Sequence, residues 1–141
     1  MAAPKGETDL HKMLKSLKPI LHPGIFVFTS VSIKDRNSIP NEEIQCEFKE
    51  KDGISLVLEK TFADKYDFIK YDFTCSWIQL EVHSSLEAVG LTAAFSNALA
   101  KAGLSCNVIA GYFHDHIFVQ DDKTNEAMNV LQNMNESWND C

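Results

Sequence analysis

The sequence of 141 residues lacks the features of several protein classes. No apolar run approaches the roughly 20 residues that a membrane-spanning helix needs, so we expect a soluble protein without a membrane partner. Its four cysteines, Cys46, Cys75, Cys106 and Cys141, form no Cys-x-x-Cys pair and follow a start without an apolar signal-peptide core. We therefore expect reduced thiols, a cytoplasmic location and no requirement for a metal or another cofactor.

Basic residues are also scarce. The chain has 13 lysines and arginines against 20 aspartates and glutamates, which gives a formal net charge of -7. A surface of this charge repels phosphate backbones, so nucleic acid is not an expected partner. The hydrophobic fraction of 45% is ordinary for a globular protein, and the length suits one domain or two very small ones.

The first half is predicted to begin with an amphipathic helix. Leu10, Met13, Leu14 and Leu17 recur at helical spacing, and Pro19 ends the helix. Extended runs are then expected at residues 20–22, 25–31, 44–50 and 54–59. The last two runs flank Asp52-Gly53, which is typical of a hairpin because glycine accepts a positive φ. Residues 32–43 are polar and without periodicity, which predicts an exposed loop.

The second half is predicted to contain a strand, a helix, a hairpin and a final helix. Residues 61–66, at the end of the first half, are predicted to form a short helical turn. Residues 71–82 are predicted to form a long strand in which Ile78, Leu80 and Val82 alternate with polar residues. Ser84 and Glu87 have the spacing of a capping box, so the next helix is expected to begin just after Ser84 or Ser85. One face of this helix carries Leu91, Phe95, Ala98, Leu99 and Ala102, and Gly103 ends it.

After this helix, residues 106–113 and 116–120 are predicted to pair as a hairpin around His114-Asp115. A last helix follows, with Ala127, Val130, Leu131 and Met134 on its apolar face. No strand remains after it. A complete β-α-β-β-α-β unit therefore needs an edge strand from the first half of the chain or from another chain, which predicts interlocked halves.

Residues 77–119 resemble the ACT domain. The shared pattern is a strand, a loop that ends in Val89-Gly90, a helix that closes with Leu-Ala-x-x-Gly at Leu99–Gly103, and a strand that opens at residues 105–109. The whole chain resembles small stand-alone proteins with two tandem ACT-like halves, here residues 1–68 and 69–141. The resemblance implies an α+β, ferredoxin-like fold with antiparallel sheets.

The resemblance also implies a function. ACT domains usually bind amino acids or similar small molecules as regulatory modules, and their sheet edges commonly pair. We therefore expect a non-catalytic regulatory or sensor protein that binds a small molecule, most naturally an amino acid, and forms a homodimer. The alternatives are a pure protein–protein interaction module and a small enzyme that uses His83, Cys106, His114 and His116.

The loop before the central helix is the predicted ligand site. Backbone N–H groups at a helix N-terminus, two hydroxyls and a glycine allow close approach of a carboxylate. Glu87 either receives the ligand's ammonium group or closes the capping box, and the loop alternatively only caps its helix. In the family, ligands commonly lie between this loop and the second strand of a neighbouring domain. The predicted ligand-binding residues are Ser84, Ser85, Leu86, Glu87, Ala88, Val89, Gly90 and Leu91 in the loop and Asn107, Val108 and Ile109 in the strand.

Three other groups of residues have a functional and a structural interpretation. His114-Asp115-His116, with His83, has ligand types suited to zinc or to proton transfer, but the spacing does not ensure three converging ligands, so we expect a polar hairpin tip without a metal. Cys106 is a nucleophile only if it is activated, and a cysteine in an apolar strand is commonly inert. Tyr112 and Phe113 suit ligand stacking, but at strand spacing we expect them in the core.

Overall fold

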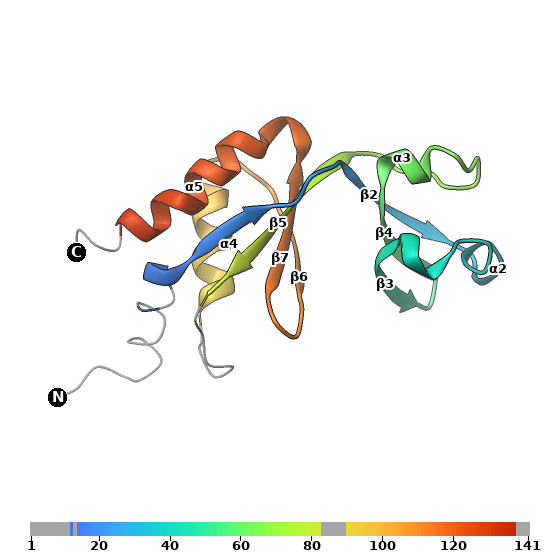
Figure 1. Cartoon of the computed structure of the whole chain (residues 1–141), viewed down its shortest axis with the longest axis horizontal. Helices are drawn as coiled ribbons and strands as arrows, with labels where there is room; N and C mark the ends of the chain where they lie inside the picture. The colour runs from blue at the N-terminus through green and yellow to red at the C-terminus, as the bar shows by residue number, and fades with distance from the viewer. Residues whose placement is uncertain (1–11, 13, 83–89, 138–141) are drawn as a thin grey trace. The chain divides into compact units, whose positions relative to one another are not determined.

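The computed structural model describes residues 12, 14–82 and 90–137, with side chains described as far as Met134. These residues form two compact units, each of which is considered by itself. One runs from Pro23 to Ser76 and is here called the inserted unit. The other joins the chain up to His22 to the chain from Trp77 onward and is here called the split unit (Figure 1).

The inserted unit is a complete β-α-β-β-α-β unit. Its elements in chain order are β2 (Phe26–Val31), α2 (Ile33–Arg36), the 3-10 turn η1 (Asn41–Glu43), β3 (Ile44–Glu50), β4 (Gly53–Glu59), α3 (Lys60–Ala63) and the beginning of β5 (Thr74–Glu81). The strand order is β3-β4-β2-β5, and every neighbouring pair is antiparallel. The predicted hairpin is confirmed, since Glu50 pairs with Gly53 at its turn. The core of this unit includes Val27, Leu56 and Leu58 from the sheet.

The split unit contains the other strands and the longer helices. Its elements are β1 (Lys18–Leu21), the rest of β5, α4 (Leu91–Lys101), β6 (Asn107–Ala110), β7 (Asp115–Gln120), the 3-10 turn η2 (Asp121–Lys123) and α5 (Thr124–Ser137). The strand order is β1-β5-β7-β6. β1 is antiparallel to β5, with Lys18 opposite Glu81 and Leu21 opposite Ile78. The predicted borrowing of an edge strand is therefore confirmed, and the strand comes from the same chain.

Helices α4 and α5 pack on one face of the sheet of the split unit (Figure 1). Phe95, Leu99 and Leu131 are fully buried between the helices and the sheet, whose Ile78 and Ile117 are also fully buried. This confirms the helical spacing read from the sequence. The N-terminal segment adds Leu14, which lies in a short helical stretch, and Leu17 to the same core.

The C-terminal end of α4 also follows the prediction. Gly103 has a φ of 78°, in the left-handed region, and the N–H of Leu104 donates to the carbonyl of Leu99 at 2.9 Å. This hydrogen bond spans the last turn as in a Schellman motif and satisfies a carbonyl that the helix leaves free. No helix of the described residues is long and apolar enough to span a bilayer.

The prediction of a loop at residues 32–43 is wrong. Ser32 caps α2, since its Oγ accepts a hydrogen bond from the N–H of Asp35 at 3.1 Å. The chain then places Ile39, which is 2% exposed, in the core before the turn η1. A helix of four residues is too short to show a helical period, which is why the pattern did not reveal it.

Two further predictions are wrong. Helix α4 begins at Leu91 after Gly90, later than the Ser84–Glu87 spacing predicts. The residues of that spacing lie outside the described part of the chain. Tyr112 and Phe113 are not core residues, because β6 ends at Ala110 and both side chains lie in the hairpin turn, 80% and 83% exposed.

Candidate functional site

The predicted ligand site belongs to the split unit, at the start of α4 and along β6. Of its loop, Gly90 and Leu91 are described, whereas Ser84 to Val89 lie outside the described residues. Leu91 is 9% exposed, and its side chain belongs to the core. In β6, Val108 packs partly against the same core, and Asn107 is exposed. Ile109 is half-buried.

Gly90 determines how α4 begins. Its φ of 98° is left-handed, and its carbonyl accepts the N–H of Ala94 at 2.9 Å. Gly90 has no side chain to cap the helix, and the first turn carries no acidic residue. The first backbone N–H groups of a helix have no partner within the helix, and they lie at the positive end of its dipole. This end of α4 therefore attracts an anion.

The two parts of the predicted site flank α4 in the sequence. Gly90 precedes its first turn, whereas Asn107 begins the strand that follows its last turn. The chain returns along the helix before this strand, because Cys106 is hydrogen-bonded to Ser96 in the middle of α4.

A cluster of aromatic and histidine side chains lies on the other face of the same sheet. Trp77 and Gln79 alternate along β5 with the core residue Ile78. The rings of Trp77 and His22 are stacked, with centroids 3.5 Å apart and planes at 5°. The Nε1–H of Trp77 donates to Nδ1 of His116 at 3.0 Å, and Nε2 of His22 lies 2.9 Å from Oε1 of Gln79.

This environment keeps His116 neutral. Its partial burial lowers the pKa of the imidazole below the ordinary value of about 6.5, and the neighbouring His114 and His22 lower it further. Asp115 opposes them but does not reverse the direction. The Trp77 hydrogen bond is consistent with this state, because Nδ1 accepts a proton donor only while it is itself unprotonated.

Acid is therefore expected to disrupt the Trp77–His116 hydrogen bond. In a Trp138→Phe background, where Trp77 is the remaining tryptophan, its fluorescence should change with a midpoint below pH 6.5. Stability should fall over the same range, because below its ordinary pKa the unfolded histidine binds a proton that the folded one does not. The loss should end once the pH passes the lowered pKa of the folded state.

The control for this titration is His116→Asn, whose Oδ1 takes the place of Nδ1, accepts the same hydrogen bond and does not titrate. The fluorescence change should disappear in this variant. A change that persists would assign the transition to His22 or another group, and a midpoint above 6.5 would contradict the inferred environment of His116.

The cysteine and histidine residues of the alternative enzyme are not arranged as an activated pair in the described part of the chain. Burial raises the pKa of the Cys106 thiol, and the hydrogen bond with Ser96 only partly opposes this. A thiol that stays protonated at neutral pH is a poor nucleophile. Nδ1 of His116 already accepts the hydrogen bond from Trp77. Among the described residues, which exclude His83, no three His, Cys, Asp or Glu side chains converge as a metal site.

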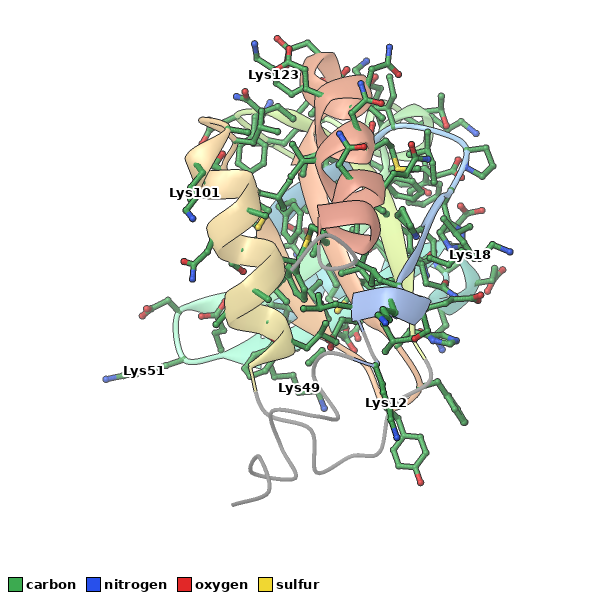
Figure 2. All side chains as sticks on the ribbon, turned by 90° about the vertical axis from the view of Figure 1, so that its left-hand side faces the viewer. Lys12, Lys18, Lys49, Lys51, Lys101 and Lys123 are labelled. Atoms are coloured by element: carbon green, nitrogen blue, oxygen red, sulfur yellow. The ribbon has the colours of Figure 1, made fainter. Side chains whose placement is uncertain are left out.

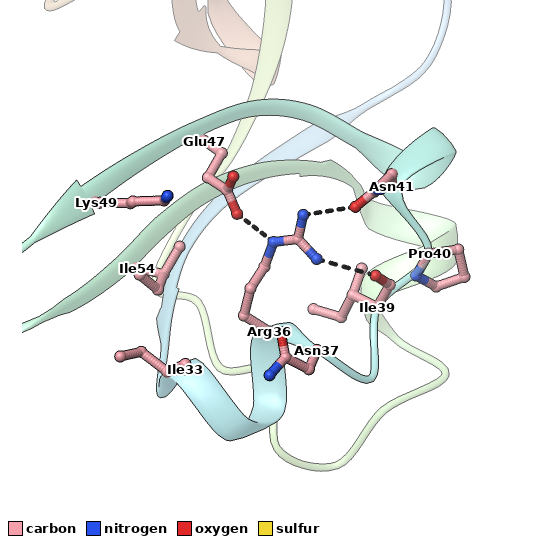
Figure 3. Close-up of a pocket in the computed structure, with 9 residues that line it drawn as sticks. All are labelled: Ile33, Arg36, Asn37, Ile39, Pro40, Asn41, Glu47, Lys49 and Ile54. Atoms are coloured by element: carbon pink, nitrogen blue, oxygen red, sulfur yellow. Dashed lines mark hydrogen bonds and ion pairs between the residues drawn. The ribbon is translucent and has the colours of Figure 1, made fainter.

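The inserted unit contains a pocket that the sequence did not predict (Figure 3). It has a volume of about 610 Å³. Sites for small molecules commonly measure about 300 to 1,000 Å³. Its walls come from α2, from the chain between α2 and η1, and from β3 and β4. The lining residues are Ile33, Arg36, Asn37, Ile39, Pro40, Asn41, Glu47, Lys49 and Ile54.

Arg36 organises this pocket. Its Nε–H donates to the carboxylate of Glu47, Nη1 donates to the carbonyl of Ile39 at 3.2 Å, and Nη2 donates to Oδ1 of Asn41 at 2.7 Å (Figure 3). These bonds hold the guanidinium between α2 and β3. The Arg36 and Glu47 side chains are only 19% and 28% exposed. The local sequence around Arg36 gives no hint of this contact, because Glu47 lies in a different element.

Each unit thus combines a four-stranded antiparallel arrangement with helices in the ferredoxin-like order, which defines a tandem α+β protein. Models of the ACT domain match residues 5–76 and residues 72–133. The chain belongs to the ACT-domain family. Neither match begins or ends at the predicted boundary between residues 68 and 69, which stays a prediction.

Solved structures share the fold. A Vibrio cholerae protein of unknown function, described as a possible transport protein, is 42% identical with a TM-score of 0.81, over 93% of this chain and 99% of that one. The ligand-free regulatory subunit of aspartate kinase from Thermus thermophilus is 8% identical with a TM-score of 0.62, over 84% of this chain and 98% of that one. Aspartate kinase from Clostridium acetobutylicum is 12% identical with a TM-score of 0.66, over 86% of this chain and 34% of that one. A comparison with curated proteins found no match.

Proposed function

We propose that the protein is a non-catalytic regulatory or sensor protein that binds an amino acid at the start of α4. The observation that supports this most directly is the conformation of Gly90, which begins α4 without a side-chain cap among the described residues, so that backbone donors of the first turn can bind a ligand. A carboxylate, which every amino acid carries, is the group that such donors bind best. The ACT family and the regulatory subunit among the solved structures agree with this role.

The proposed site is completed by a second copy of the chain. β6 is the last strand in the order of its sheet, and an edge strand has backbone groups free to pair. Pairing of two β6 edges would form a homodimer and add Asn107 to Ile109 of one copy to the surroundings of the ligand. The α4 loop of the other copy supplies the carboxylate contacts.

The experiment is a thermal-shift screen of the full chain against the amino acids, followed by calorimetric titration of Gly90→Asp. A ligand at a hundred times its dissociation constant adds about 2.7 kcal/mol to stability, which a melting curve detects. Gly90→Asp should abolish binding, because like charges repel strongly in a partly dry site. The fold should survive, since aspartate tolerates a left-handed φ better than most residues and an acidic group suits a helix N-terminus.

Gly103→Asp is the matched control. Gly103 also has a left-handed φ, lies at the other end of α4, and has no atom within 4 Å of an added Cβ. This variant should bind the amino acid with the affinity of the parent protein. If Gly90→Asp bound the amino acid as tightly as the parent protein, the start of α4 would not be the binding site. Absence of any binder to the parent would contradict the proposal and favour an interaction module.

A further inference from the structure

We propose that the pocket around Arg36 in the inserted unit is a second ligand site, which binds a small organic monocarboxylate with an aliphatic body. It differs from the proposed amino-acid site in position and in chemistry. Its residues come from α2, the chain that follows it, β3 and β4, all within one compact unit.

The pocket exists because α2 is short. In the split unit, the helix between the first two strands of the ferredoxin-like order, α4, has 11 residues, whereas its equivalent α2 has four. A helix of one turn covers less of its sheet than one of three turns. Glu47 pairs with Leu56, and Lys49 with Ile54, so these two β3 side chains share the face of the sheet that carries the core. They line the space beside α2 that a longer helix would cover (Figure 3).

The charges of this pocket favour a single negative charge on the ligand. Glu47 is neutralised by Arg36, with which it forms an ion pair. Lys49 makes no ion pair within the described residues, so the lining carries one uncompensated positive charge. The guanidinium of Arg36 has five N–H donors, of which three are used by Glu47, Ile39 and Asn41. Two N–H donors of Arg36 therefore have no acceptor among the described residues and are available to a carboxylate, and the exposed Lys49 is a second cation of the same lining.

The other walls favour an aliphatic body. Ile39 and Ile54 are held in the core and are 2% and 6% exposed, so their contribution to the pocket is fixed in position. Ile33 is a large apolar side chain that is 71% exposed at the pocket. A ligand with a branched alkyl group would bury its own apolar surface and that of Ile33 away from water, which is favourable. Pro40 adds a rigid apolar surface.

The same features select against the zwitterion of an amino acid. An α-ammonium group would need an acceptor beside the carboxylate, where Arg36 and Lys49 are both cations. The one acidic side chain of the lining, Glu47, is already paired with Arg36. Leucine and 4-methylpentanoate have the same carbon skeleton and differ only in the ammonium group. The pocket should therefore prefer 4-methylpentanoate.

Calorimetric titration of the full chain with 4-methylpentanoate tests this inference. The parent protein should bind it, and should bind 4-methylpentanamide, which has the same shape without the charge, at least about tenfold more weakly. Lys49→Gln should weaken the binding of 4-methylpentanoate to a similar degree while leaving the melting temperature unchanged, because Lys49 forms no ion pair with any residue that the structure describes. Ile33→Asn should also weaken it.

Lys51→Gln is the matched control. It makes the same charge change two residues further along the chain, in the β3–β4 turn, where Lys51 is exposed and extends away from the ribbon (Figure 2). It should bind with the affinity of the parent protein. Gly90→Asp should likewise leave this binding unchanged, which separates the two sites. Equal weakening by Lys49→Gln and Lys51→Gln would show a general effect of charge and overturn the assignment.

Two further outcomes would also overturn the proposal. One is the absence of binding of 4-methylpentanoate to the parent protein at millimolar concentration. The other is binding of the amide or of leucine to the Arg36 pocket as tightly as the acid, which chemical-shift changes at Glu47 and Lys49 would reveal. Neither outcome bears on the amino-acid site at Gly90, which lies in the other unit.

Discussion

Leu99→Ala is expected to lower the free energy of unfolding by about 2 to 5 kcal/mol. Leu99 is 0% exposed and lies in the core of the split unit with Phe95 and Ile117. Truncation removes apolar atoms that are fully buried and leaves a cavity, because the neighbouring side chains of a packed core relax only partly. Denaturant unfolding of the parent and the variant, with the slope of the transition checked, measures this difference.

Asn97→Ala on the same helix is the control for this measurement. Asn97 is exposed, so its replacement should change stability by less than about 0.5 kcal/mol. Alanine has the higher helix propensity at both positions, so a difference between the two variants reports burial. A denaturation midpoint of Leu99→Ala that equals that of the parent would mean that α4 presents another face to the sheet.

The parts of the fold that the sequence predicted are those with a local pattern. Ile78 and Leu80 alternate with Trp77 and Gln79 because a strand presents successive side chains to opposite faces, and the structure buries the first pair in the core. The spacing of Phe95 and Leu99 similarly follows from the helical period. These patterns are set by neighbours in sequence, so they are visible without a structure.

The parts that the sequence did not predict depend on distant contacts or on short elements. The pocket around Arg36 forms only when β3 brings Glu47 to α2. No pattern in residues 32–43 predicts the contact between Arg36 and Glu47. Tyr112 and Phe113 have the composition of strand residues. The hydrogen bond from the N–H of Gly111 to the carbonyl of His114 at 2.9 Å closes the turn and exposes both rings. Apolar composition alone does not distinguish a strand from the turn beside it.

The predicted ligand loop was predicted correctly in one respect and wrongly in another. The family pattern placed a glycine at the start of the helix, and Gly90 has the conformation that favours glycine over other residues. The capping-box spacing of Ser84 and Glu87 led to a start that is too early, because a spacing of two residue types is a weaker determinant than a left-handed glycine. The assignment of ligand contacts to the loop and to Asn107, Val108 and Ile109 stays a prediction.

Leu14→Ala is expected to destabilise the split unit by about 2 to 5 kcal/mol, although its residue lies far in sequence from most of that unit. Leu14 is 0% exposed and belongs to the same core as Leu131, Ile117 and Leu99. The following strand β1 pairs with β5 along the edge that the ferredoxin-like order requires. A loss of packing at Leu14 should therefore destabilise the strands of the split unit.

Native-state hydrogen exchange distinguishes this from a general loss of stability. In Leu14→Ala, amides of β7 should lose protection, whereas amides of β4, whose core includes Leu56 and Leu58, should retain more of theirs. Lys15→Ala is the control, since Lys15 is an exposed neighbour and its loss should leave both strands unchanged. Equal protection of β7 in Leu14→Ala and the parent would contradict the interlocked arrangement. The packing of the N-terminal segment would then contribute little to the stability of the sheet in the split unit.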